Sequence, residues 1–151
     1  MILRSFELGK IKLNNHKFYL LYGDNEGLKE ETIKNLFERD YQNKIHRYEE
    51  KEILDDISNF FNSLLTKSFF DNEKLIIISR ATDKITKTIE ELIEKNPDNI
   101  NIILISKNLE KKSTLRKFFE KEKTIICVPF YEDNNQTLNS IINLFFRNKK
   151  I

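Results

Sequence analysis

Residues 64–78 of the chain read LLTKSFFDNEKLIII, and the second half of this stretch decides the fold. The run LIII at 75–78 is aliphatic and mostly β-branched, which is typical of a strand buried on both faces of a parallel sheet. Two adjacent phenylalanines, Phe69 and Phe70, precede this strand within a polar frame. Adjacent side chains diverge by about 100° on a helix and alternate faces on a strand, so one core cannot easily bury both rings. We therefore expect at least one ring to be partly exposed.

An exposed aromatic pair at the end of an element has two interpretations. Aromatic side chains contribute much of the binding energy at protein interfaces, which makes Phe69 and Phe70 a candidate anchor for a partner protein. Alternatively, one ring packs beneath the strand and the other caps a helix, because single exposed apolar residues are common on soluble proteins. The spacing of the residues leaves both interpretations open.

Apolar strands alternate with amphipathic helices along the chain. The predicted strands are residues 17–23 (KFYLLYG), 44–48 (KIHRY), 75–79 (LIIIS), 100–105 (INIILI) and 124–128 (TIICV). Apolar residues at helical spacing predict helices around residues 28–37, 52–65, 82–95, 111–121 and 135–147. This alternation predicts an α/β fold with a five-stranded parallel sheet and helices on both faces. The mostly polar strand at 44–48 is expected at a sheet edge.

The composition suits a single helix-rich domain. Charged residues make up 33% of the 151 residues and hydrophobic residues 39%, with only 3 glycines and 2 prolines. The 26 Lys and Arg nearly balance the 24 Asp and Glu, so the net charge of +2 does not by itself indicate nucleic-acid or membrane binding. The single cysteine, Cys127, excludes an internal disulfide and is expected in the core. Because no apolar run is long enough for a membrane span or signal peptide, we expect a cytoplasmic protein without membrane contacts.

The loop after the first predicted strand resembles a phosphate-binding loop only in part. It reads GDNEGLKE at 23–30, with three residues between its glycines where a P-loop has four. Lys29 does not directly follow the second glycine, and Glu30 stands where a P-loop has the Ser or Thr that holds magnesium. The acidic residues of the loop would also repel a triphosphate. We expect a helix cap made by Asp24 or Asn25, and no bound nucleotide, other cofactor or metal ion.

The chain lacks the catalytic side chains that enzymes of this layout carry at the strand ends. An ATPase would have acidic residues at the end of the third strand, where this chain reads SRAT at 79–82. A phosphoacceptor domain of the receiver type would need an aspartate at that strand end and a lysine after the last strand, where Val128 and Pro129 stand. The sequence therefore offers no catalytic residue, and whether the chain is part of an enzyme stays uncertain.

Basic residues concentrate in residues 107–123, with Glu110, Glu120 and Glu122 interleaved. We interpret this segment as the solvated face of a helix. Weak contact with phosphate groups is the alternative interpretation.

The chain resembles the N-terminal domain of the bacterial DNA polymerase III delta subunit, the clamp-loader subunit that opens the sliding clamp. The resemblance covers nearly the whole chain and rests on FYLLYGDNEGLKEE (18–31), SFFDNEKLIII (68–78), IILISKNLEKKSTLRKFF (102–119), the strand 125–128 and the helix from Asn135. It implies a P-loop NTPase/AAA+-like three-layer sandwich without a working P-loop. It also implies a single domain at 1–151, a fragment without the middle and collar domains of the family.

The resemblance gives the aromatic pair a role. In that family an apolar residue, often leucine, and a phenylalanine insert into a hydrophobic pocket on the clamp. Carried over to this sequence, Phe69 and Phe70 become the clamp anchors, preceded by Ser68 and supported by Leu64 and Leu65. Phe69 departs from the usual leucine at the first position of this pair.

The resemblance also implies partners and a biological role. The partners are the sliding clamp and other clamp-loader subunits, with DNA contacted indirectly or weakly, and the role is in DNA replication. As a subunit of the DNA polymerase III holoenzyme, such a protein has no catalytic site of its own. The alternatives are an atypical P-loop nucleotide-binding protein and an interaction domain for another protein.

Overall fold

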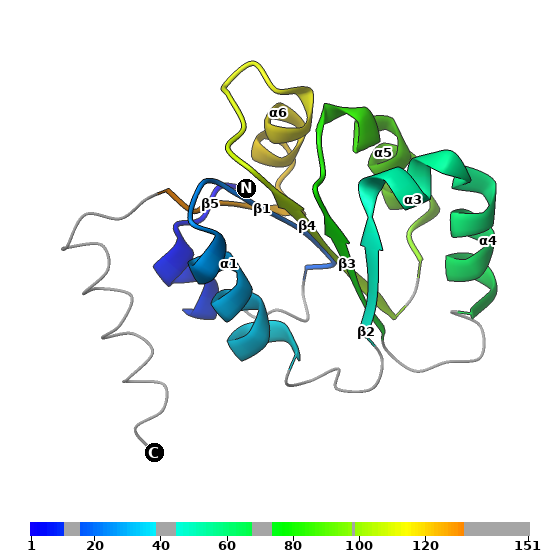
Figure 1. Cartoon of the computed structure of the whole chain (residues 1–151), viewed down its shortest axis with the longest axis horizontal. Helices are drawn as coiled ribbons and strands as arrows, with labels where there is room; N and C mark the ends of the chain where they lie inside the picture. Colours follow the sequence, from blue (N-terminus) through cyan, green and yellow to red (C-terminus); the bar gives the residue numbers. More distant parts are fainter. Residues whose placement is uncertain (11–15, 39–44, 68–73, 98, 132–151) are drawn as a thin grey trace.

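The computed structural model describes residues 1–10, 16–38, 45–67, 74–97 and 99–131. Within these residues, parallel strands form one sheet in the order β2-β3-β4-β1-β5 (Figure 1). The strands are β1 (Phe18–Tyr22), β2 (Ile45–Glu49), β3 (Lys74–Ser79), β4 (Ile100–Ser106) and β5 (Ile126–Pro129). The predicted five-stranded parallel sheet is confirmed, and the polar strand β2 lies at an edge as predicted.

Strand β1 lies between β4 and β5. Leu20 of β1 is in register with Leu104 of β4 and with Cys127 of β5. Cys127 is buried as predicted, and burial raises the pKa of its thiol to about 12. Because all five strands run in the same direction, the loops that follow β1, β3 and β4 meet at the carboxyl edge of the sheet. This edge is where open α/β sheets place their ligand sites.

Helices cover both faces of the sheet, as the sequence predicted. One face carries α3 (Glu50–Asp55), α4 (Ile57–Lys67), η4 (Asp83–Ile85), α5 (Thr86–Lys95) and α6 (Thr114–Lys121). The other face carries η1 (Ser5–Lys10), α1 (Glu26–Ile33) and η3 (Lys34–Glu38). Each layer buries its own apolar cluster, because side chains alternate between the two faces along every strand. The sheet is therefore the middle of three layers (Figure 1).

The single helix predicted at 52–65 is wrong, because the structure has two helices here. The backbone of Asp56 leaves the helical region at φ −151°, which ends α3 and starts α4. The carboxylate of Asp56 then accepts a hydrogen bond from the N–H of Asn59 at 3.1 Å. Aspartate competes with the helix in this way because its short side chain can bond to nearby backbone groups.

Two other helix predictions have different outcomes. The basic helix predicted at 111–121 starts later, at Thr114, because the hydroxyl of Ser113 caps it by accepting from the N–H of Arg116. The last predicted helix, at 135–147, lies outside the described residues. None of the helices in the described parts of the chain is both long and apolar enough to cross a membrane.

Candidate functional site

The loop after β1 is folded tightly against the end of β5. Gly23 has φ +128°, and a β-carbon placed on it would lie 2.0 Å from the carbonyl oxygen of Phe130. Two backbone hydrogen bonds hold this approach, one from Phe130 N–H to the Tyr22 carbonyl at 2.6 Å and one from Asn25 N–H to the Phe130 carbonyl at 3.1 Å. Only glycine is compatible with both this conformation and this distance. The first glycine of the P-loop-like sequence therefore serves backbone packing.

The lysine of this loop is used inside the protein. Lys29 is fully buried, and its ammonium group donates to the carbonyls of Gly23 at 2.8 Å and Ser106 at 2.7 Å and to the carboxylate of Glu26 at 2.8 Å. An ammonium group has three N–H donors, so all of them are engaged by protein oxygens. The predicted helix cap is confirmed, since the side chain of Asn25 accepts from the N–H of Leu28 at 3.2 Å. The loop is thus a packed turn with a capped helix and leaves no lysine donor for a phosphate.

A groove of about 830 Å³ opens beside this loop at the carboxyl edge of the sheet. Its lining residues are Glu26, Glu30, Ser79, Arg80, Ala81, Thr82, Ile105, Ser106, Lys107, Asn108 and Leu109. The lining includes two carboxylates, of Glu26 and Glu30, and two basic side chains, of Arg80 and Lys107, so the groove has mixed charge. Mixed charge does not favour a polyphosphate over other ligands.

A carboxylate does reach the end of β3, but it comes from another element. Glu50, at the start of α3, is 7% exposed and accepts from the N–H of Thr82 at 2.8 Å and from its hydroxyl at 2.8 Å. These hydrogen bonds fasten α3 to the loop after β3. In an ATPase of this layout, an acidic side chain at this strand end would bind magnesium. Here the carboxylate of Glu50 is instead held by Thr82.

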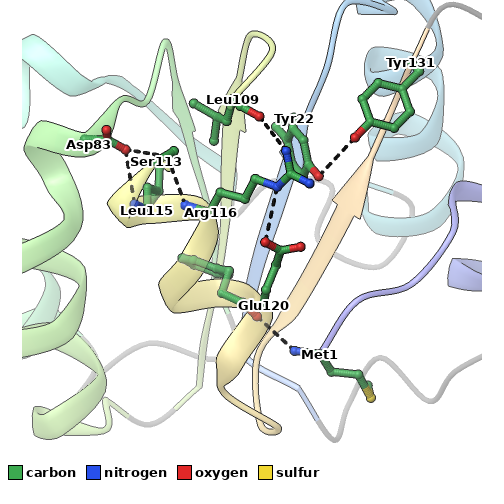
Figure 2. Close-up of polar contacts among 10 residues, drawn as sticks. Met1, Tyr22, Asp83, Leu109, Ser113, Leu115, Arg116, Glu120 and Tyr131 are labelled. Atoms are coloured by element: carbon green, nitrogen blue, oxygen red, sulfur yellow. Dashed lines mark hydrogen bonds and ion pairs between the residues drawn. The ribbon is translucent and has the colours of Figure 1, made fainter. Parts of the chain in front are cut away.

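The next residue along this loop fastens α6. The carboxylate of Asp83 accepts from the hydroxyl of Ser113 and, at 3.1 Å, from the N–H of Leu115 (Figure 2). The hydrogen bond from Ser113, with those from the backbone of Thr114 and Leu115, lowers the pKa of Asp83 below its ordinary value. A carboxylate at the first turn of a helix also interacts favourably with the helix dipole. The pair Glu50 and Asp83 thus ties α3, the β3 loop and α6 together.

Asp83 gives a pH-dependent prediction. Because its pKa is lower in the folded state, its contribution is present above the unfolded pKa, near 3.8, and is lost as the pH falls through the folded pKa. We expect Asp83→Ala to lower the free energy of unfolding by about 1 kcal/mol at pH 7, a modest value because the carboxylate is exposed to solvent. Urea unfolding at pH 7 and pH 3 should show the difference from the unsubstituted chain shrinking. Asp83→Asn, which keeps an acceptor oxygen, should lose less, and an undiminished difference at pH 3 would refute the role of the charge.

The side chain of Arg116 fixes α6 over β1. Its guanidinium donates to the carbonyl of Leu109 at 2.8 Å and to Glu120 at 3.2 Å, and it lies 5.1 Å from the ring centre of Tyr22 (Figure 2). The Tyr22 hydroxyl lies 3.5 Å from that of Tyr131, and burial raises the pKa of Tyr22. These contacts fasten α6 to β1 and to the loop that precedes α6.

Of the predicted anchor residues, Leu64 and Leu65 belong to α4, and the others follow α4 in the sequence before β3. Leu64 is 4% exposed and packs in the apolar cluster of its face of the sheet, and Leu65 is half-buried. Ser68, Phe69 and Phe70 lie outside the described residues. The described residues on either side of this connection are Lys67, which ends α4, and Lys74, which begins β3 at the amino edge of the sheet. Leu64 thereby anchors the last turn of α4 to the core.

Sequence patterns alone did not predict the roles of Lys29, Glu50 and Arg116. Lys29 did carry a signal, because it stands beside Leu28 and four residues before Ile33 on the apolar side of the predicted helix. Glu50 and Arg116 gave no local signal, since their partners Thr82 and Tyr22 lie far away along the chain.

Comparisons with known proteins cover most of the chain. The sequence model of the family "DNA polymerase III, delta subunit" matches residues 19–128. A comparison with curated proteins finds no match. Among solved structures, the chain is similar to the Bacillus subtilis DNA clamp loader delta protein (YqeN), with a TM-score of 0.57 and 16% sequence identity. That similarity covers 88% of this chain and 42% of the Bacillus subtilis chain, and at this identity it shows a shared fold.

The family match spans the sheet from β1 to β5 and includes the loop after β1, the α4–β3 connection and α6. It covers well over half of the 151 residues. The chain therefore belongs to the DNA polymerase III delta subunit family.

Proposed function

We propose that this chain is the N-terminal, AAA+-like domain of a delta-type clamp-loader subunit, and that it binds the sliding clamp during DNA replication. The observation that carries the proposal is the family match over residues 19–128. The fold shared with a clamp loader delta protein over 42% of that protein's length supports a single domain of a longer subunit. The proposed partners are the sliding clamp and, through further domains, other loader subunits, all acting in the cytoplasm.

The proposed contact with the clamp is the pair Phe69 and Phe70. Burying each ring in a hydrophobic pocket should contribute roughly 1.5–3 kcal/mol. Two rings could thus supply much of a micromolar affinity, which corresponds to about −8 kcal/mol. Rigid supports on both sides favour such an anchor, because a preorganised contact loses less conformational entropy on binding. Leu64, buried on one side, and the buried strand β3 on the other are suited to this supporting role.

The proposed mechanism is mechanical. A domain that opens the clamp must bind the open form more tightly than the closed form, since only differential affinity shifts an equilibrium. Lys29 has no free donor for a phosphate, and Glu50 is engaged by Thr82, so neither is poised for ATP chemistry. Control by ATP is accordingly assigned to partner subunits that hide or reveal the aromatic pair.

Phe70→Ala tests the anchor. We expect it to weaken clamp binding by at least about 30-fold, equivalent to about 2 kcal/mol, because the ring fills a pocket on the partner. The thermal unfolding midpoint should stay nearly unchanged. Calorimetric titration of the variant with the clamp, beside a thermal melt, measures both quantities.

Tyr131→Ala is a matched control, because Tyr131 is an exposed aromatic residue that follows β5, the strand at the sheet edge opposite β2. Its clamp affinity should equal that of the unsubstituted chain. If Phe70→Ala unfolds the protein, the ring belongs to the core and the anchor assignment is wrong.

Titration with magnesium and ATP separates the proposal from its enzyme-class alternative. An atypical P-loop protein would bind ATP in a magnesium-dependent way at residues 23–29, whereas the engaged ammonium of Lys29 leads us to expect no binding. ATP binding without clamp binding would replace our proposal with the nucleotide-binding alternative. If the chain binds neither ATP nor the clamp, the alternative that stands is an interaction domain for another protein.

A further inference from the structure

Lys29 lies where two neighbouring strands of the sheet send the chain to opposite faces. β1 is followed by α1 on one face, and its neighbour β4 is followed by α6 on the other face (Figure 1). Open α/β sheets place their ligands at such a switch point, because the two loops diverge there and leave a crevice. The groove beside the loop after β1 lies at this point, and Glu26 and Ser106 are among its lining residues.

The ammonium group of Lys29 joins the two diverging loops. Its hydrogen bonds to the carbonyls of Gly23 and Ser106 connect the end of β1 to the end of β4. A backbone hydrogen bond from the N–H of Gly23 to the carbonyl of Lys107 connects the same loops, but it is longer, at 3.3 Å. A hydrogen bond from a charged donor is about twice as strong as a neutral one, so the ammonium group makes the stronger connection.

Three oxygens surround this ammonium group, and we call them the ammonium site. They are the carbonyl oxygens of Gly23 and Ser106 and the carboxylate Oε1 of Glu26, at 2.8, 2.7 and 2.8 Å from Nζ. These distances are typical of charge-assisted N–H···O bonds, and a primary ammonium has one N–H donor for each oxygen. Calcium and magnesium ions take at least about six oxygen ligands, so the site suits an ammonium better than these metal ions.

We propose that the ammonium site binds primary ammonium ions, that its occupant in this chain is Lys29, and that this built-in ligand holds the loops after β1 and β4 in one arrangement. Nucleotide-binding proteins of this layout hold an exchangeable phosphate ligand at the same strand ends. Here the occupant is part of α1 and is fully buried, so it does not exchange with solvent. The inference rests on contacts within the domain and does not depend on the proposed clamp contact.

Lys29→Ala tests the site, because it removes the ammonium group and keeps the three oxygens. Propylammonium then supplies the missing carbons and the ammonium group, and it can enter from the groove that Glu26 and Ser106 line. A ligand that binds only the folded state raises the folding equilibrium constant by the factor 1 + [L]/Kd. In urea unfolding of the whole chain at pH 7, we expect about 100 mM propylammonium to raise this constant about tenfold, which corresponds to a Kd of about 10 mM.

Two controls separate binding at this site from a general effect of salt or amine. Tetramethylammonium carries the same charge but has no N–H donor, so at the same concentration it should change the folding constant of Lys29→Ala less than about twofold. Lys34→Ala removes an exposed lysine directly after α1 and leaves the ammonium site occupied by Lys29. Its stability should not respond to propylammonium beyond the response of the unsubstituted chain.

Amide hydrogen exchange tests whether the ammonium group holds the two loops together. The N–H of Gly23 donates to the Lys107 carbonyl, so its exchange reports the opening of these loops. We expect it to exchange at least about tenfold faster in Lys29→Ala than in the unsubstituted chain. Added propylammonium should slow this exchange again, and tetramethylammonium should not.

If Lys29→Ala is unfolded in buffer, the titration is run with trimethylamine N-oxide, which favours the compact state. The inference is overturned if propylammonium does not stabilise the variant under either condition. It is also overturned if tetramethylammonium stabilises Lys29→Ala equally, or if Lys34→Ala responds to propylammonium as strongly. Equal exchange of the Gly23 amide in Lys29→Ala and in the unsubstituted chain would show that the ammonium group does not hold the loops.

Discussion

Replacing Gly23 with alanine is expected to lower the free energy of unfolding by more than about 3 kcal/mol. The backbone has φ +128°, a conformation that residues with a β-carbon rarely adopt. The new carbon would also lie 2.0 Å from the Phe130 carbonyl oxygen and 2.5 Å from its carbonyl carbon. These are backbone atoms, so no side-chain rotation relieves the clash. The end of β1 and the segment after β5 would have to separate.

Gly27→Ala is the matched control in the same loop. No atom lies within 4 Å of a β-carbon added there, and the residue is exposed within α1. Because alanine favours a helix more than glycine does, this variant should be stabilised by about 0.5–1 kcal/mol. Urea unfolding followed by circular dichroism measures both changes. Equal stability of the two variants would show that the close contact at Gly23 is not needed.

Lys29→Met is expected to lower the free energy of unfolding by about 3 kcal/mol. Methionine keeps an unbranched side chain of similar length but has no ammonium group. The carbonyls of Gly23 and Ser106 would then lose a hydrogen-bond donor in a buried place, and each such loss costs about 1–3 kcal/mol. Glu26 contributes little to the effect, because its carboxylate is 59% exposed and can be hydrated.

Lys34→Met controls for loss of a lysine from the same helical segment. Lys34 is exposed and follows α1 directly, so its replacement should change stability by less than about 0.5 kcal/mol. Denaturant unfolding of the two variants compares them directly. If Lys29→Met is as stable as Lys34→Met, the buried ammonium does not hold the loop together.

The strands could be predicted because their signals are local. β1, β3 and β4 read as continuous apolar runs, and a strand buried on both faces needs such a run. The edge position of β2 followed from the polar residues in its short segment. The break between α3 and α4 was missed because Asp56 stands within an apolar pattern that fits one continuous helix. The spacing of apolar residues shows which face of a helix is buried, and that face can be the same before and after a short break.

The contacts that shape the loop after β1 and the loop after β3 could not be predicted. Lys29 donates to a carbonyl 77 positions away along the chain, and Glu50 binds Thr82 across 32 positions. Such pairs depend on which strands are neighbours, and alternation alone does not give the strand order. The loop after β1 was correctly predicted as a capped helix start, from the short polar residues before it. The anchor role of Phe69 and Phe70 came from family resemblance and stays a prediction.

Calorimetric titration of the folded chain with the sliding clamp of the same organism tests the central claim most directly. The account predicts saturable binding with a dissociation constant of roughly micromolar, about −8 kcal/mol, in the absence of any nucleotide. A chain that melts cooperatively but gives no binding to the clamp at concentrations well above that constant would contradict it.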